Sequence, residues 1–290
     1  MEETKIHENV VEDSIIALLQ KQGYEIVDDS SESYDWLQNR QLDEFLNEGL
    51  LRESIHRINP NLPPEDIDET IQIIERIDQP SLFERNETFH RYLVDGITIE
   101  DQKLPVNPLV KLLDFEHPEN NVFQVFHQVE YKEGRNTRIP DVVIYINGIP
   151  LILMELKSFM EDATKATLED AYAQLGGCSE RDGYRYDIPT IFIYNAFLVI
   201  SDGVLTKVGT LTSKIDRFNE WKSVNGEKGY DDSCTNKLQI MIEGLFTKER
   251  ILDVIQNNLF FIKDKNDKPI KILAQYHQYF GVLKSLASIM

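Results

Sequence analysis

The sequence predicts an α/β protein in which helices flank a mixed β-sheet, with helical parts at both ends of the chain. Three observations predict this class. Apolar residues recur at helical spacing in the first hundred residues, β-branched and aromatic runs replace them from about residue 106, and helical periodicity returns after residue 237. The chain has 290 residues, of which 41% are hydrophobic, so it can bury one large core or two small ones.

The first hundred residues are expected to be mainly helical. Ile15, Leu18 and Leu19 follow a helical spacing ahead of a break at Gly23, and prolines in residues 60–64 stop one helix and begin another. We therefore expect a short strand over residues 24–27 and four helices, one ending before Gly23 and the others over residues 42–55, 67–77 and 83–93, the last ending at Gly96.

The middle of the chain is expected to form the sheet. Asn147-Gly148 is a strong turn signal between two apolar runs. The β-branched and aromatic content predicts strands over residues 122–129, 139–146, 150–156, 190–194 and 197–201, with a helix over residues 164–175 between the third and the fourth.

The remainder is predicted to be a polar loop over residues 220–235 and a helical tail over residues 237–290 with a turn near residues 263–268. The chain is thus expected to divide into three segments: a mainly helical part (1–100), a sheet core (101–220), and a loop followed by a helical segment (221–290).

The charge is distributed unevenly along the chain. The net charge of −20 argues against strong binding to nucleic acid, because phosphate binding depends on Lys and Arg. Residues 1–100 carry 24 acidic and 8 basic side chains, which leaves 26 acidic and 22 basic side chains in residues 101–290. A DNA site in the second part is therefore permitted, although the charge does not require one.

Candidate catalytic residues lie on two of the predicted strands. Asp141 opens one strand, and Glu155-Leu156-Lys157 closes the next. On a strand, Glu155 and Lys157 point to the same face while Leu156 points to the core. Carboxylate oxygens suit Mg²⁺, and a lysine can hold the attacking water or offset charge on phosphate. The alternative is a chance motif in which Glu155 and Lys157 form an exposed ion pair at a strand end.

A shared metal site at these residues requires a particular strand register. An ideal two-residue turn at Asn147-Gly148 would pair Asp141 with Met154 and leave Glu155 on the opposite face of the sheet. We therefore predict a shift of one residue, through a three-residue loop that includes Ile149, or through a bulge elsewhere, most naturally near Pro140 or Pro150.

The motif and its surroundings resemble a known family. Pro140-Asp141 with Glu155-Leu156-Lys157 is similar to the PD-(D/E)xK nuclease signature. Further segments resemble the amino-terminal nuclease domain of the R subunit of type I restriction-modification enzymes, in the same order along the chain: residues 57–60, 86–90, 142–157, 170–175, 187–189, 194–195, 200–203 and 276–280. The resemblance covers most of the chain.

The resemblance implies a PD-(D/E)xK core that acts as a Mg²⁺-dependent endonuclease on double-stranded DNA, with Mn²⁺ as a substitute. Asp141, Glu155 and the carbonyl of Leu156 would hold the metal. It further implies an ATP-driven motor outside this chain, methyltransferase and specificity subunits as partners, and a cytoplasmic location. The alternatives are a non-catalytic module that docks the motor to the methyltransferase, and a free-standing DNA repair nuclease.

Three other residues are carried over from the resemblance. Glu12 matches an acidic residue that many such nucleases place near the metal, although it equally fits an ordinary acid on a solvated helix face. The family pairs a Gln with a Tyr four residues later for DNA contact. Here Gln174 matches, but the tyrosine position falls on Tyr184, which implies an insertion of about six residues. Tyr184 and Tyr186 are also candidates for stacking on bases.

Several classes are excluded or disfavoured by what the sequence lacks. No apolar run approaches the roughly 18 residues of a membrane helix, and no signal peptide is recognisable at the amino end. Cys178 and Cys234 form no disulfide framework, which fits a reducing cytoplasm. The six histidines show no zinc-ligand spacing on a helix.

Overall fold

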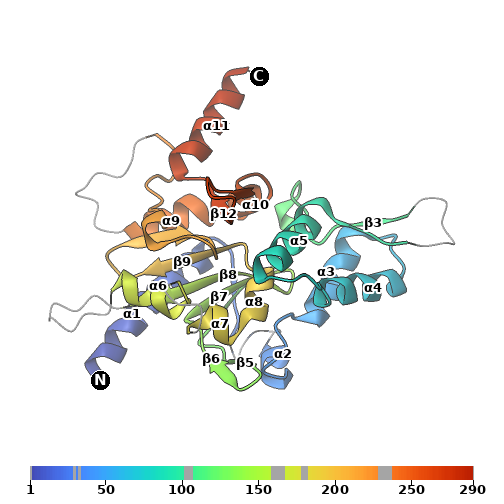
Figure 1. The fold of residues 1–290 in the computed structure, drawn as a ribbon, viewed down its shortest axis with the longest axis horizontal. Coiled ribbons are helices and arrows are strands. Elements are labelled where there is room, and N and C mark those ends of the chain that lie inside the picture. Colours follow the sequence, from blue (N-terminus) through green and yellow to red (C-terminus); the bar gives the residue numbers. More distant parts are fainter. Residues whose placement is uncertain are drawn as a thin grey trace.

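The predicted α/β class is confirmed by a computed structural model (Figure 1), which describes residues 2–28, 31, 34–100, 107–157, 167–177, 182–227 and 237–289. A mixed sheet of six strands forms the centre of this part of the chain. Its strands, in spatial order, are β1 (Glu25–Ile26), β4 (Phe123–His127), β7 (Val142–Ile146), β8 (Ile149–Leu156), β9 (Phe197–Ser201) and β10 (Thr206–Gly209). The first of them comes from the mainly helical first hundred residues.

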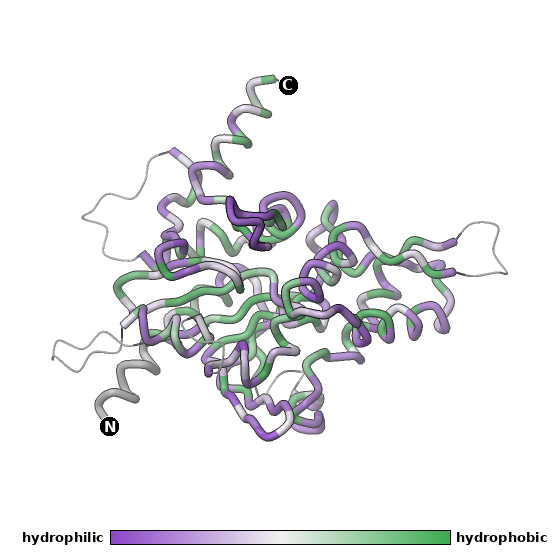
Figure 2. The backbone as a smooth tube through the Cα atoms, viewed as in Figure 1, coloured by the Kyte–Doolittle hydropathy of each residue, from purple (hydrophilic) through white to green (hydrophobic). Residues whose placement is uncertain are grey.

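The centre of the sheet is covered on both faces. Strand β7 runs antiparallel to both of its neighbours, β4 and β8, and β9 runs antiparallel to β10. The pairs β1 with β4 and β8 with β9 are parallel. All eight residues of β8 are buried, and since successive side chains alternate between faces, helices must cover both. Figure 2 shows these central strands as hydrophobic segments inside a more polar periphery.

Helices from distant parts of the sequence provide this cover. Helix α1 (Glu2–Lys21) contacts β8 and α9 (Lys237–Leu245), whereas α6 (Leu168–Gln174) and α8 (Pro189–Tyr194) also contact β8. The predicted helix over 164–175 is thus confirmed in its described part. It begins after Thr167, which forms a capping box with Asp170.

The helices of the first hundred residues follow their capping signals. They are α2 (Tyr34–Asn39), α3 (Glu48–Ile58), α4 (Pro64–Glu75) and α5 (Leu82–Asp95). Helix α5 ends at Gly96 as predicted, but the helix predicted from residue 42 begins only at Glu48. The reason is Asn47, whose Oδ1 accepts from the Leu50 amide at 3.1 Å and so caps the helix. The short α2 was not predicted.

The strand predicted over residues 190–194 is wrong, because this segment is helix α8. Pro189 occupies its first turn, where a proline is pre-organised for a helix. The four residues that follow Thr190 are all buried, so the run lacks the polar face that marks a surface helix. Helix α8 lies between α5 and β8, and buried helices and buried strands have the same apolar composition.

The tail is also less helical than predicted. Between α10 (Lys248–Asn257) and α11 (Tyr276–Ile289) lies an antiparallel hairpin of β11 (Leu259–Lys263) and β12 (Pro269–Leu273). The turn expected near residues 263–268 is the turn of this hairpin. Further short elements are β2 (Ile97–Thr98) paired with β3 (Leu109–Val110), β5 (Tyr131–Glu133) paired with β6 (Asn136–Arg138), α7 (Tyr184–Asp187) and the 3₁₀ turns at Pro118–Asn120 and Ile215–Arg217.

The register of β7 and β8 contains the predicted shift. Ile146 pairs with Ile149 and Tyr145 with Pro150 across a two-residue turn, but Ile144 pairs with Ile152. Leu151 is therefore the extra residue of a β-bulge beside Pro150, which has no amide hydrogen to donate. The bulge alternative is confirmed, and the three-residue loop is wrong.

None of the helices in the described ranges has the length and apolar character needed to span a bilayer. Cys178, Cys234 and residues 228–235 of the predicted loop over residues 220–235 lie outside the described residues.

Candidate functional site

Three neighbouring strands end at the same edge of the sheet and bring their polar residues together. The β4–β7 register places Gln128 opposite Asp141, and the Gln128 amide donates to the Asp141 carbonyl at 3.1 Å. Beyond the bulge, the β7–β8 register continues to Asp141 opposite Glu155. Residues directly opposite each other point to the same face, so the two carboxylates share one side of the sheet.

Glu155 is fully buried, and its carboxylate is only partly hydrogen-bonded. Its Oε1 accepts from Lys157 Nζ at 2.7 Å, whereas Oε2 is buried and has no hydrogen-bond partner. Native proteins seldom leave a buried acceptor unsatisfied. The alternative of an exposed ion pair between Glu155 and Lys157 is wrong, because the glutamate side chain has no exposed surface and the lysine side chain only 13%.

The electrostatics of the site favour an additional positive charge. Burial, and after it the nearby Asp141, raise the pKa of Glu155 to about 8, although the charge and the hydrogen bond of Lys157 work in the opposite direction. Burial also raises the pKa of Asp141, although the Leu156 amide, which donates to Asp141 Oδ2 at 2.7 Å, works in the opposite direction. Two carboxylates whose charged forms are disfavoured would both be stabilised by a cation.

Glu12 on α1 reaches this site through other residues. Its Oε1 lies 3.0 Å from His127 Nδ1, and its Oε2 accepts from Gln128 Nε2 at 2.8 Å. The same Nε2 donates to Asp141 Oδ1 at 3.2 Å. The hydrogen bond to Glu12 raises the pKa of His127. Glu12 is buried, so it is not an acid on a solvated helix face, but its contact with Asp141 is indirect.

Gln174 and Tyr184 meet although they lie ten positions apart in the sequence. Gln174 Nε2 donates to the Tyr184 hydroxyl at 2.6 Å, and this hydroxyl donates to the carbonyl of Ile139, two residues before Asp141, at 3.1 Å. Burial and the nearby Glu155 raise the pKa of Tyr184. Stacking of Tyr184 on a base is ruled out in this conformation, because its side chain is only 2% exposed, whereas Tyr186 is 54% exposed.

His127 and Gln128 are the site residues that sequence reasoning missed. Both fall inside the predicted strand over residues 122–129, where they were counted only as strand residues. The one available signal is that two polar residues follow each other at the end of an otherwise apolar run.

The site can supply oxygen ligands but not a complete metal cage. No group of three His, Cys, Asp or Glu side chains with the spacing of a metal site occurs among the residues that the structure describes. Asp141, Glu155 with its unbonded Oε2, and the Leu156 carbonyl remain as candidate oxygen donors. Such a set fits Mg²⁺, which retains waters and takes few protein ligands.

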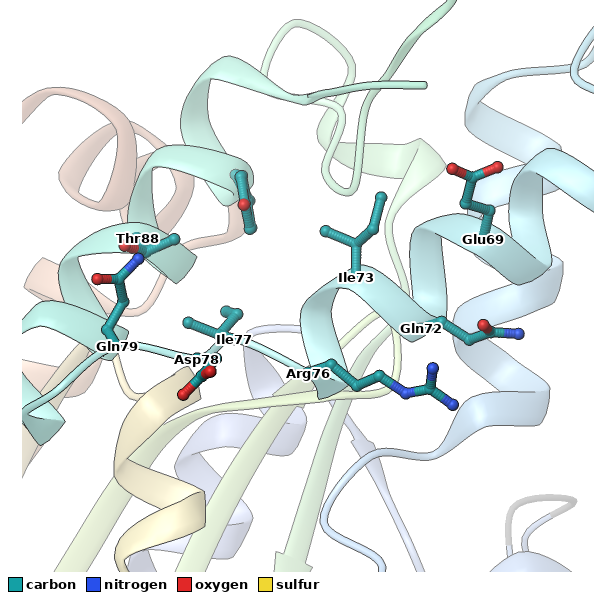
Figure 3. Close-up of a pocket in the computed structure, with 9 residues that line it drawn as sticks. Glu69, Gln72, Ile73, Arg76, Ile77, Asp78, Gln79 and Thr88 are labelled. Carbon is teal, nitrogen blue, oxygen red and sulfur yellow. The ribbon is translucent and has the colours of Figure 1, made fainter. Parts of the chain in front are cut away.

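A separate cavity of about 320 Å³ lies between α4 and α5 (Figure 3). Ile73, Arg76 and Tyr92 are among its lining residues. None of the residues of the strand-end site, that is Gln128, Asp141, Glu155 and Lys157, lines it. It therefore plays no part in the chemistry considered for the carboxylates.

Comparison with known proteins identifies the family. The family model described as type I restriction enzyme R protein N terminus matches residues 5–217. The chain belongs to this family. Among its relatives, the type I restriction enzyme HindI endonuclease subunit of Haemophilus influenzae is 34% identical over 249 residues, covering 82% of this chain and 22% of that protein.

A second relative extends the similarity of this R-protein N terminus to nearly the whole chain. The putative type I restriction enzyme MjaIXP endonuclease subunit of Methanocaldococcus jannaschii is 30% identical over 306 residues, covering 98% of this chain and 28% of that protein. The chain thus spans about a quarter of the length of these relatives. Both relatives are named as endonuclease subunits of type I restriction enzymes.

Proposed function

We propose that this chain is the Mg²⁺-dependent DNA-cleaving module of a type I restriction enzyme and hydrolyses phosphodiester bonds of double-stranded DNA. One observation carries the proposal. Asp141 and Glu155 lie on one face at the ends of neighbouring strands, beside Lys157, and one Glu155 oxygen is buried without a partner. A divalent cation at this position would be bound by both carboxylates and would satisfy the buried oxygen.

Asp141, Glu155 and the carbonyl of Leu156 would hold the cation, with Mn²⁺ able to replace Mg²⁺. When bound, such an ion lowers the pKa of a coordinated water and stabilises charge on phosphate oxygens. Glu155 would then lose its proton, which it otherwise keeps at neutral pH because its pKa is raised to about 8. Metal binding is therefore expected to become tighter as the pH rises towards 8.

Lys157 would act on the water and on the phosphate. Its ammonium group is held at 2.7 Å from Glu155 Oε1, so it lies next to the carboxylate that binds the cation. From there it can orient the attacking water and offset the charge that develops on the phosphorus oxygens. The attacking water gives one proton to solvent as its oxygen bonds to phosphorus, the bond from phosphorus to the leaving sugar oxygen breaks, and solvent supplies that leaving oxygen with a proton.

Gln174 and Tyr184 would line the DNA side of this site. Because Tyr184 is buried, its contribution is to hold the Gln174 side chain, which is partly exposed. Gln174 is therefore the member of the pair that would touch DNA.

The length of the relatives supports a place for this module in a larger assembly. They are about four times longer than the matched region, which accommodates an ATP-driven motor outside this chain. In this proposal the methyltransferase and specificity subunits select the site, the motor delivers double-stranded DNA, and the complex works in the cytoplasm. Delivery by partners would also explain how a chain of net charge −20 engages DNA.

The decisive experiment measures metal binding and DNA nicking in parallel. Mn²⁺ titration of the chain should show a site that Asp141→Asn weakens at least about tenfold, while the exposed control Asp43→Asn leaves it unchanged. Supercoiled plasmid should be nicked only with Mg²⁺ or Mn²⁺ and only by wild type and the control. Equal Mn²⁺ binding by wild type and Asp141→Asn would refute the metal site, and intact binding without nicking in the assembled enzyme would favour the docking module.

A further inference from the structure

Gln128 has a backbone conformation that its residue type seldom adopts. Its φ is 51°, in the left-handed region. Of the residues that the structure describes, two other non-glycine residues share a positive φ, Asn147 and Asp267, and both lie in the turns of hairpins. Gln128 lies instead at a bend directly after β4. Strain of this kind persists where the surrounding structure enforces it, often beside a functional site.

The surroundings that enforce it are the contacts of Gln128 with Asp141. Its amide hydrogen donates to the Asp141 carbonyl, and its side-chain Nε2 donates to Asp141 Oδ1 at 3.2 Å and to Glu12 Oε2 at 2.8 Å. A side-chain amide has two hydrogens to donate, and both are used here. The kink thus turns the side chain so that it joins helix α1 to the carboxylate of Asp141.

The result is a carboxylate held at both oxygens. Asp141 Oδ2 accepts from the Leu156 amide, which lies on β8, while Oδ1 accepts from Gln128, which follows β4. Each carboxylate oxygen has a further lone pair, so these hydrogen bonds fix the orientation of the carboxylate and still leave lone pairs for a cation. Hydrogen-bond donors behind a metal ligand typically set its orientation in this way.

We propose that Gln128 is a positioning residue for the Asp141 carboxylate, and that Glu12 acts through it by holding its amide from α1. The proposal rests on the proposed function, in which Asp141 binds the cation. In this proposal Glu12 does not contact the cation but holds Gln128, which in turn orients Asp141. This agrees with the geometry, in which Glu12 is hydrogen-bonded to Gln128 and His127.

The test compares Gln128→Ala and Gln128→Gly with wild type in the full chain, using Gln72→Ala on the exposed surface of α4 as the matched control. Mn²⁺ titration should show affinity reduced about 10- to 100-fold in both Gln128 variants and unchanged in the control. Without metal, the Gly variant should have a higher Tm than the Ala variant, because glycine adopts a positive φ freely. The added Tm shift on Mn²⁺ binding should be smaller in both.

Coupling with Glu12 tests the second half of the proposal. If Glu12 acts through Gln128, the double variant Glu12→Ala, Gln128→Ala should bind Mn²⁺ no more weakly than Gln128→Ala alone. Fully additive losses would show that Glu12 acts independently and would overturn this part.

The outcomes separate the two proposals. Wild-type Mn²⁺ affinity in both Gln128 variants, together with loss of binding in Asp141→Asn, would overturn the role of Gln128 and leave the nuclease proposal standing. Equal binding by wild type and Asp141→Asn would instead remove the metal site on which both depend.

Discussion

Glu155 and Lys271 are two buried charged side chains with opposite surroundings. Lys271 on β12 donates from Nζ to Asn86 Oδ1 at 3.0 Å and to the Asn195 carbonyl at 2.8 Å, and it lies 5.0 Å from the centre of the Phe261 ring. Glu155 has one oxygen bonded to Lys157 and the other without a partner. Both are shifted by burial toward their neutral forms.

This difference indicates that Lys271 is buried for stability, whereas Glu155 belongs to a site that can bind a ligand. Lys271 is surrounded by neutral acceptors that belong to the chain itself and that tie the β11–β12 hairpin to α5 and to the residues after α8. Burying a charge is costly unless such partners are present. Glu155 keeps one oxygen that has no hydrogen-bond partner among the described residues, and its nearby groups, Lys157 and Tyr184, lower its pKa only in part. A bound cation would make the burial of this carboxylate more favourable. The predictions that follow test this contrast.

The largest effect is expected at Lys157, and it should be confined to chemistry. Lys157→Met removes the ammonium group but keeps most of the apolar stem, so we expect DNA cleavage to fall about 100- to 1000-fold. ATP hydrolysis and translocation by the assembled enzyme should persist, because Lys157 lies in the strand-end site. Plasmid cleavage and ATPase assays on the same preparation measure both. Cleavage at the wild-type rate would contradict the role given to this lysine.

Loss of Lys271 should affect stability instead. Lys271→Ala removes a buried side chain and leaves the Asn86 and Asn195 acceptors without this donor, at a cost of about 3 kcal/mol in the free energy of unfolding. Mn²⁺ affinity at the carboxylates should not change. Urea denaturation and metal titration test the two halves. A variant of normal stability that loses metal binding would break the contrast between the two buried groups.

The smallest effect is a pH dependence of the metal-free chain. Because the folded pKa of Glu155 is raised from the ordinary value of 4.5 to about 8, its contribution to stability is fully present below about pH 4.5 and is lost as the pH rises to about 8. Glu155→Gln keeps the shape without the charge. We expect it to be more stable than wild type above pH 8 by at least about 1 kcal/mol, with the advantage vanishing near pH 5.

Thermal unfolding at a series of pH values with a chelator present measures this dependence. The matched control is Glu69→Gln on the exposed surface of α4. The difference between wild type and Glu155→Gln should also disappear when saturating Mn²⁺ is added to wild type, since the cation then supplies the missing charge. A difference that stays constant from pH 5 to pH 9 would exclude Glu155 as its source.

The sequence was sufficient to predict the strands that carry the motif, the motif itself and the register that the motif demands. Strand alternation and the Asn147-Gly148 turn gave an arrangement that could not hold one ion, and the required bulge is present beside Pro150. Where capping residues are explicit, as at Gly96, the helix end was also correct. These features depend on local chemistry, which a sequence displays directly.

The missed features depend on tertiary contacts. Pro189 and the apolar run after it form a helix that packs between α5 and β8. Because the run is buried there, it has the same apolar composition as a buried strand, and the local pattern does not distinguish the two. The role of Gln128 depends on a backbone kink and on Glu12, which is 116 residues away in the sequence. The contact of Gln174 with Tyr184 likewise depends on how the chain returns after the segment between α6 and α7.

The bulge at Leu151 has a bearing on how such chains can vary in length. Thirteen residues separate Asp141 from Glu155, an odd number, and the bulge converts this odd count into a shared face. Deletion of Leu151 alone would leave a regular hairpin with the carboxylates still paired, whereas insertion of a single residue that the strands absorb would turn one of them away. Relatives that keep both carboxylates should therefore change this spacing only by gaining or losing whole bulges or pairs of residues, so that the shared face of the two carboxylates is preserved while the number of residues between them changes.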